Sequence, residues 1–271
     1  MIETRERSDH QRRAASMTSL VWDTRAVFQR EMSLVLRDPF SIIFSLVQPL
    51  VFLGLFGPLL AGSVDPATIN GASPLQWFLP GVIVMICLFG TSTTGSNLMF
   101  EIMTGSYERV LAAPLHRSSI LIGKALKELA PLIVQAALVV LVSIPFGFKL
   151  YPLPVVCGLL LLGVFGVGMG AFSNALGIAA RKREWMFWAV QQSVLFPLLI
   201  LSGMMLPLEA GPRWIQVLGL FNPLTYIVDA ERALFSGTFN DPAIGWAVLV
   251  AVLTCAAGLW VGVKQVARST T

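Results

Sequence analysis

Charged residues are scarce in this sequence of 271 residues. Asp, Glu, Lys and Arg make up 13% of it, whereas 55% of the residues are hydrophobic and the mean hydropathy is +0.75. An ordinary soluble domain has roughly 25% charged residues. The composition therefore excludes such a domain and predicts one helical membrane domain with little soluble mass on either side.

Cysteine and histidine are also too few and too scattered to form a site. Cys87, Cys157 and Cys255 stand alone inside apolar runs, and His10 and His116 lie far apart in polar segments. Neither set has the spacing of a disulfide framework or a metal centre. We expect the cysteines to fill apolar space, and we expect no metal site.

The sequence lacks two features that would let it drive transport by itself. It has no G-x-x-x-x-G-K-[ST] motif, because Ser118 stands where the first glycine before Gly123 and Lys124 would be, so a P-loop is excluded. No ionisable residue lies in the core of an apolar run, which argues against a proton-coupled antiporter, a voltage-gated channel or an intramembrane enzyme. Sodium coupling through main-chain carbonyls stays open. If movement of a solute is driven by ATP, the energy would have to come from a separate polypeptide.

What the sequence does have is six long apolar runs. Each has about 20 residues or more, enough at ~1.5 Å per residue to cross a ~30 Å hydrocarbon layer. Because the runs are apolar on every face, the predicted fold is an all-α polytopic membrane protein with six transmembrane helices. The spans lie near 40–61, 77–98, 121–148, 153–180, 185–206 and 244–263.

The positive charges predict the orientation. Of the 19 Lys and Arg residues, seven precede the first span, four follow the second, three follow the fourth and two end the chain, which leaves Lys149, Arg213 and Arg232 for the other side. The positive-inside rule then places both termini in the cytoplasm. The basic residues can face anionic lipid heads, so no nucleic-acid partner is expected.

The first 38 residues divide into two parts. Residues 1–17 are polar and are expected to be a disordered cytoplasmic tail. Residues 18–38 have the period of an amphipathic helix that lies on the cytoplasmic membrane surface, with Phe28 on its apolar face and Arg37 on its polar face. Glu31 falls within the apolar stripe, where it either snorkels towards water or pairs with a basic group of a neighbouring element.

Small polar residues interrupt the second and fifth spans. In lipid such residues serve either interhelical hydrogen bonds or a water-accessible route. Both uses stay open from the sequence. If they line a route, the candidate path residues are Thr91, Thr94, Asn97, Gln191, Gln192 and Ser193.

Glycine and proline predict two further local features. The pairs Gly166/Gly170 and Gly258/Gly262 are GxxxG motifs, for which core packing inside one subunit is favoured over a dimer face. Residues 207–243 are too polar and too rich in proline for a seventh span, yet too apolar for a free loop. They predict a pair of short re-entrant or interfacial helices on the outer side.

Four stretches follow one another along the six spans, and each alone is a weak signal. They are Arg37-Asp-Pro39 with Gln48 to Gly57; Leu79 to Val84; Thr104 to Arg117 with Gly123-Lys124; and Phe196-Pro197 through Asn222-Pro-Leu-Thr-Tyr226 to Ala233. In order and spacing, over nearly the whole chain, they resemble the membrane subunits of type-2 ATP-binding-cassette (ABC) exporters, especially the daunorubicin-resistance-like permeases.

This resemblance implies an architecture and a set of partners. Residues 39–263 would be the transmembrane domain and 264–271 a cytoplasmic tail, in a multi-pass protein of the bacterial inner cell membrane. A second copy of this permease or a paralogous permease would pair with it, and two copies of a separate ABC ATPase would drive alternating access. The chain would be no enzyme and would hold no cofactor, because ATP and Mg would bind the ATPase.

The resemblance also assigns roles to segments. Residues 18–38 would be the connecting helix, 105–114 would be the coupling segment that docks on the ATPase, and spans two and five would flank the route. The candidate coupling residues are Glu101, Gly105, Tyr107, Glu108, Arg109 and Pro114.

The resemblance favours a hydrophobic or amphipathic solute such as a drug, exported from the cytoplasm. A polysaccharide or glycolipid exporter of the same superfamily is the alternative. A structural assembly factor without effect on a partner ATPase is a third reading, from a different functional class.

Overall fold

The computed structural model describes residues 21–30, 32–33, 39–63, 73–106 and 117–269, and within these ranges the chain is helical without a β-strand. Residues 21–30 form the first helix. The other helices are α2 (Pro39–Ser63), α3 (Pro74–Ser92), α4 (Thr94–Met103), α6 (Arg117–Ser143), α7 (Pro152–Ala179), α8 (Glu184–Ile200), α9 (Arg213–Leu220), α10 (Pro223–Phe235) and α11 (Pro242–Ser269), with 3-10 turns η1 (Ile144–Phe146) and η2 (Leu208–Ala210).

Four helical segments of the described residues are long and apolar enough to cross a membrane. They are Pro74–Met103, which joins α3 and α4, then Leu129–Phe146, Pro152–Ala179 and Pro242–Gln265. The prediction of an all-helical membrane protein is confirmed. The other two expected spans correspond to helices with shorter apolar segments: Leu46–Leu59 within α2, and α8, which has 17 residues.

Local sequence signals fix where several helices begin. The Ser73 hydroxyl accepts a hydrogen bond from the Gln76 amide at 3.1 Å, and Pro74 occupies the first turn of α3. Asn222 caps α10 in the same manner, since its side-chain oxygen accepts from the Leu224 amide at 3.0 Å and Pro223 follows it. A polar cap before proline satisfies amides that would otherwise lack a partner.

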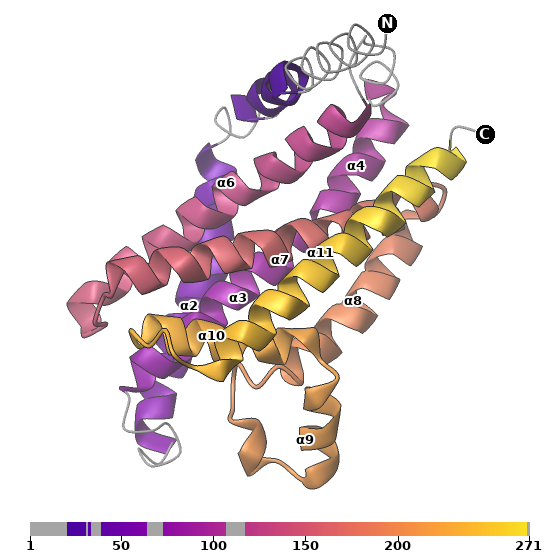
Figure 1. Cartoon of the computed structure of the whole chain (residues 1–271). Coiled ribbons are helices and arrows are strands. Elements are labelled where there is room, and N and C mark those ends of the chain that lie inside the picture. Colours follow the sequence, from indigo (N-terminus) through magenta and orange to yellow (C-terminus); the bar gives the residue numbers. More distant parts are fainter. Residues whose placement is uncertain (1–20, 31, 34–38, 64–72, 107–116, 270–271) are drawn as a thin grey trace, which may run out of the picture.

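Helix α7 lies at the centre of the bundle and contacts α3, α4, α6, α10 and α11 (Figure 1). Its glycines allow these close crossings. A Cβ atom on Gly168 would lie 2.7 Å from Thr254 O of α11, and one on Gly166 would lie 3.2 Å from Cys87 Sγ of α3. Gly166 belongs to one GxxxG pair, and Gly258 of the other pair packs against Gly168, so a glycine of each pair packs inside one subunit as predicted.

The helix ends gather into two groups in Figure 1. The end of α4, the start of α6 and the end of α11 lie toward the top, whereas the end of α2 and helix α9 lie toward the bottom. The 21–30 helix lies on the upper group. Its Val27 is buried against α6, where a Cβ on Gly123 would lie 2.7 Å from Val27 Cγ1.

Residues 207–243 form short helices, as the sequence predicted. Their predicted place on the outer side of the membrane stays a prediction. η2, α9 and α10 follow α8 in succession, and α10 is held against α3, α7 and α11. α9 is the more peripheral of the two, with Trp214 and Phe221 exposed. Trp and Tyr at such positions suit a headgroup layer.

Candidate functional site

The second span is broken at Thr93, between α3 and α4. Hydroxyls on both sides of the break donate to main-chain carbonyls three or four residues earlier. Before it, Thr91 donates to Cys87 O at 2.7 Å, and after it, Ser96 donates to Thr93 O at 2.8 Å. Ser and Thr that bond back in this way bend helices. The polar run therefore has a local structural effect, because it divides one long span into two rigid segments.

At this break the Ser92 carbonyl becomes the centre of a junction between three helices. It accepts hydrogen bonds from Gln191 Nε2 of α8 at 2.7 Å and from Ser173 Oγ of α7 at 2.6 Å. The Gly95 amide of α4 in turn donates to Ser173 Oγ at 3.0 Å. The junction links the helices of spans two, four and five through one carbonyl.

A groove of about 550 Å³ opens beside this junction, between α2, α3 with α4, α6 and α8. Its walls combine apolar and aromatic side chains with carboxamides and one ammonium group, and no Asp or Glu is among the described residues that line it. The lining residues are Gln48, Pro49, Met85, Ile86, Phe89, Gly90, Ser92, Thr93, Asn97, Lys127, Pro131, Leu132, Gln135, Trp188, Gln191 and Gln192.

The candidate path residues fall into two sets. Asn97, Gln191 and Gln192 line the groove together. Thr91 and Thr94 are buried instead, and Thr94 Oγ1 lies 3.2 Å from Gly170 O of α7.

Ser193 is exposed on α8 outside the groove. Gln192 and Ser193 are thus adjacent in sequence but differ in whether they line it.

Several groove residues escaped the sequence analysis. Gln48, Gln135 and Trp188 line the groove but had no assigned role. Each of the two glutamines is an amide inside an otherwise apolar run, and this pattern could have identified them. Burying an amide in lipid costs free energy unless the amide is hydrogen-bonded.

The side-chain amide of Gln191 is held in place at the edge of the groove. Its side chain is 8% exposed, and Nε2 is engaged by Ser92 O. Its Oε1 is buried and has no hydrogen-bond partner within the described residues. An unused acceptor in an apolar setting costs free energy unless a donor reaches it.

Only part of the candidate coupling set lies in the described residues. Glu101 is half-buried on α4, and Gly105 ends that helix with a left-handed φ of 68° that favours glycine. The remaining candidates, Tyr107, Glu108, Arg109 and Pro114, lie outside the described residues, as do Glu31 and Arg37 of the interfacial helix. Phe28 of that helix is half-buried.

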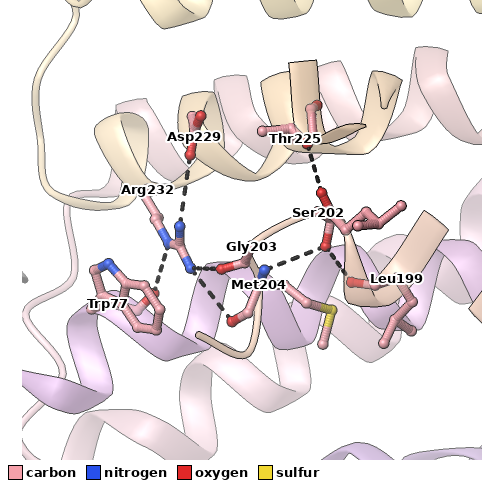
Figure 2. A network of polar contacts seen from close by, with 10 residues as sticks. Trp77, Leu199, Ser202, Gly203, Met204, Thr225, Asp229 and Arg232 are labelled. Carbon is pink, nitrogen blue, oxygen red and sulfur yellow. Dashed lines mark hydrogen bonds and ion pairs between the residues drawn. The ribbon is translucent and has the colours of Figure 1, made fainter. Parts of the chain in front are cut away.

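Arg232 of α10 clamps three chain segments at the end of the bundle near α9 (Figure 2). It donates to Gly203 O at 2.8 Å and to Trp77 O at 3.3 Å, and its guanidinium lies 3.7 Å from the Trp77 ring centroid. Asp229 lies 3.6 Å from it. Burial lowers the pKa of Arg232 to about 10, so the side chain remains a cation at neutral pH.

Glu231, the neighbour of Arg232, is a buried acid that sequence reasoning did not single out. Its side chain is fully buried, and neither carboxyl oxygen has a hydrogen-bond partner within the described residues. The carboxyl lies against Gly158 of α7, where a Cβ would collide with it. The acid lies in α10, outside the four candidate spans, and burial raises the pKa of Glu231 to about 8.

This burial predicts a pH-dependent stability. The unfolded chain releases the Glu231 proton near the ordinary value of 4.5, while the folded protein holds it up to about pH 8. The folded state therefore binds more protons between these values, and its stability falls as the pH rises through the window. Glu231→Gln is expected to flatten this dependence and to stabilise the protein at pH 8.5 by a few kcal/mol, on the order set by the pKa shift.

Thermal unfolding in lipid nanodiscs at pH 5 and pH 8.5 measures the effect. Glu184→Gln, which changes an exposed carboxylate at the start of α8, is the control and should leave the difference between the two pH values unchanged. Equal pH dependence in wild type and Glu231→Gln would show that Glu231 is ionised in the folded protein.

Comparison with known proteins identifies the family. The model of the family described as "ABC-2 type transporter" matches residues 23–236, which includes the groove, the junction at Ser92 and the Arg232 clamp. The chain therefore belongs to the ABC-2 type transporter family. It is a type-2 ABC permease by descent, as the resemblance in its sequence indicated.

Individual relatives agree with this family. The chain is 31% identical over 214 residues to the daunorubicin resistance ABC transporter permease protein DrrB1 of Streptomyces coeruleorubidus, a match that covers 78% of this chain and 74% of the relative. It is 28% identical to the putative transport permease ycf38 of Cyanophora paradoxa, covering 84% and 79%. A probable doxorubicin resistance ABC transporter permease protein, DrrC of Mycobacterium tuberculosis, is 23% identical, covering 84% and 83%.

Proposed function

We propose that this chain is the transmembrane subunit of an ABC exporter that moves a hydrophobic or amphipathic solute out of the cytoplasm. The six spans are α2, α3 with α4, α6, α7, α8 and α11, in the inner membrane of a bacterial cell, with both termini cytoplasmic. One observation carries the proposal: a permease of this family has a groove of about 550 Å³ lined by three of the candidate path residues. Its mixed apolar and amide lining suits an amphipathic solute.

Energy comes from a separate ABC ATPase, present in two copies, which binds ATP and Mg. A second copy of this permease or a paralogous permease completes the pore. The sequence supports this division of labour because it contains no P-loop. The names of the relatives support drug efflux as the class of transport.

Coupling passes through α4. Residues 99–120 receive the motion of the ATPase, and they begin within α4, which is followed by the left-handed turn at Gly105. Because α4 contributes Asn97 to the groove and is joined to α7 and α8 at the Ser92 junction, a shift of α4 as a rigid body would change the groove.

Co-purification with an ABC ATPase, followed by solute-stimulated ATP turnover, tests the proposal. Glu108→Ala and Arg109→Ala are expected to bring the stimulated rate down towards the basal rate, because each removes a polar contact to the ATPase. Lys182→Ala, in the exposed turn between α7 and α8, is the control and should keep the stimulation. Unchanged stimulation in both loop variants would reject these docking residues, and absence of any complex would reject the exporter function.

A further inference from the structure

The groove contains a detail that bears on which solute it accepts. Five of its lining residues carry a carboxamide: Gln48, Asn97, Gln135, Gln191 and Gln192. A carboxamide presents both a hydrogen-bond donor and an acceptor, which matches a hydroxyl group, itself both donor and acceptor. An organic cation instead requires acceptors and a compensating negative charge.

None of the described residues that line the groove is Asp or Glu. Among the described lining residues Lys127 is the one side chain with a formal charge, and it is positive. A cationic solute would meet no carboxylate among these described residues, and its transfer from water to a site with apolar walls is costly. The Trp188 ring face offers a weak attraction for cations, but a ring does not replace a counterion.

Gln191 adds a requirement of its own. Its buried Oε1 has no hydrogen-bond partner within the described residues, and its position is fixed because Nε2 donates to Ser92 O at 2.7 Å. This oxygen can only accept a hydrogen bond. The matching group on a solute is therefore an uncharged hydrogen-bond donor, such as a hydroxyl.

We propose that the groove binds an uncharged, hydroxyl-bearing amphipath, with its polar head at Gln191 and Gln192 and its apolar part against Phe89 and Trp188. The proposal rests on the export function argued above and names its substrate class. Glycosylated small molecules and glycolipids both carry this head. Cationic amphipaths are disfavoured.

Binding to the full-length permease in lipid nanodiscs tests the proposal without any ATPase. The probes share one brominated decyl chain and differ in the head: glucoside, phosphate or trimethylammonium. Quenching of tryptophan fluorescence below micelle-forming concentrations reports binding, and Trp188→Phe defines the part of the signal that comes from the groove. We expect the glucoside to bind at least about tenfold more tightly than the trimethylammonium probe, a difference equivalent to about 1.4 kcal/mol.

Two substitutions on α8 sharpen the test. Gln191→Leu removes the free acceptor and should weaken the glucoside by about three- to tenfold, the range of one hydrogen bond, with little change for trimethylammonium. Gln192→Glu adds the missing carboxylate and should shift the preference towards the cation. Ser193→Glu adds the same charge one residue away, outside the groove, and should not.

A competition experiment distinguishes whether the hydroxyl-bearing head belongs to a small molecule or to a lipid. Displacement of the glucoside probe by a soluble alkyl glycoside assigns a glycosylated small molecule, and stronger displacement by a glucosyl diacylglycerol in the nanodisc assigns a glycolipid.

Equal or tighter binding of the trimethylammonium probe to wild type, or no saturable binding of the glucoside, would overturn the proposal. Neither result would affect co-purification with the ATPase, which tests the exporter function. Failure of the substrate proposal can therefore be distinguished from failure of the exporter function.

Discussion

Gly168→Ala is expected to separate α7 from α11 and to destabilise the protein by about 3 kcal/mol or more, at or above the upper end of the usual cost of overpacking. A Cβ at this position would lie 2.7 Å from both Thr254 O and Cys255 N. These are backbone atoms of a helix, so they cannot move aside as a flexible side chain would. The added methyl group must push the two helices apart along their whole contact.

Gly245→Ala is the matched control because Gly245 lies in α11, the helix that Gly168 of α7 contacts. A Cβ on Gly245 would meet no atom within 4 Å. In a helix interior, alanine is favoured over glycine by roughly 0.5–1 kcal/mol, so this variant is expected to be slightly more stable. Thermal unfolding in nanodiscs should therefore move in opposite directions for the two variants. A shift of the same sign would contradict the close crossing of α7 and α11.

Arg232→Ala is the second substitution with a large expected effect, a loss of about 3 kcal/mol or more. The side chain is 16% exposed and joins α10 to the turn after α8 and to α3. Its removal leaves the carbonyls of Gly203 and Trp77 without their charged donor and takes the cation from the Trp77 ring. The outer helices should detach from α3 first.

Thermal unfolding and protease cleavage within residues 201–222 measure this effect. Arg213→Ala is the control, since Arg213 is an exposed arginine at the start of the neighbouring α9. Arg232→Lys keeps the charge but loses the planar fork of donors, so its stability should lie between those of wild type and Arg232→Ala. Equal stability of Arg232→Ala and Arg213→Ala would mean that the clamp contributes nothing.

Much of the helical framework was predictable because hydrophobicity in a membrane protein is a local property. The apolar runs coincide with α2, α3, α6, α7, α8 and α11. The proline-rich segment 207–243 contains the short helices α9 and α10. Pro74 and Pro223 after their caps marked two helix starts. Composition did not predict that α8 is only 17 residues long, because Pro197 and the turn at Gly203 shorten a run that is apolar throughout.

The candidate site was only partly predictable because side-chain partners are set by tertiary contacts. Thr91 and Gln191 looked equivalent in sequence, yet one bonds within its own helix and the other lines the groove. Glu231 belongs to a segment predicted to form re-entrant or interfacial helices, and it is buried because α10 packs against α3, α7 and α11, with Gly158 next to its carboxyl group. A single sequence does not show which helix faces meet.

The measurement that tests the account most directly is solute accumulation in vesicles that contain this permease with or without its ATPase. We expect the glucoside probe to accumulate only when permease, ATPase, ATP and Mg are all present. Accumulation by the permease alone, in vesicles without the ATPase, would contradict it.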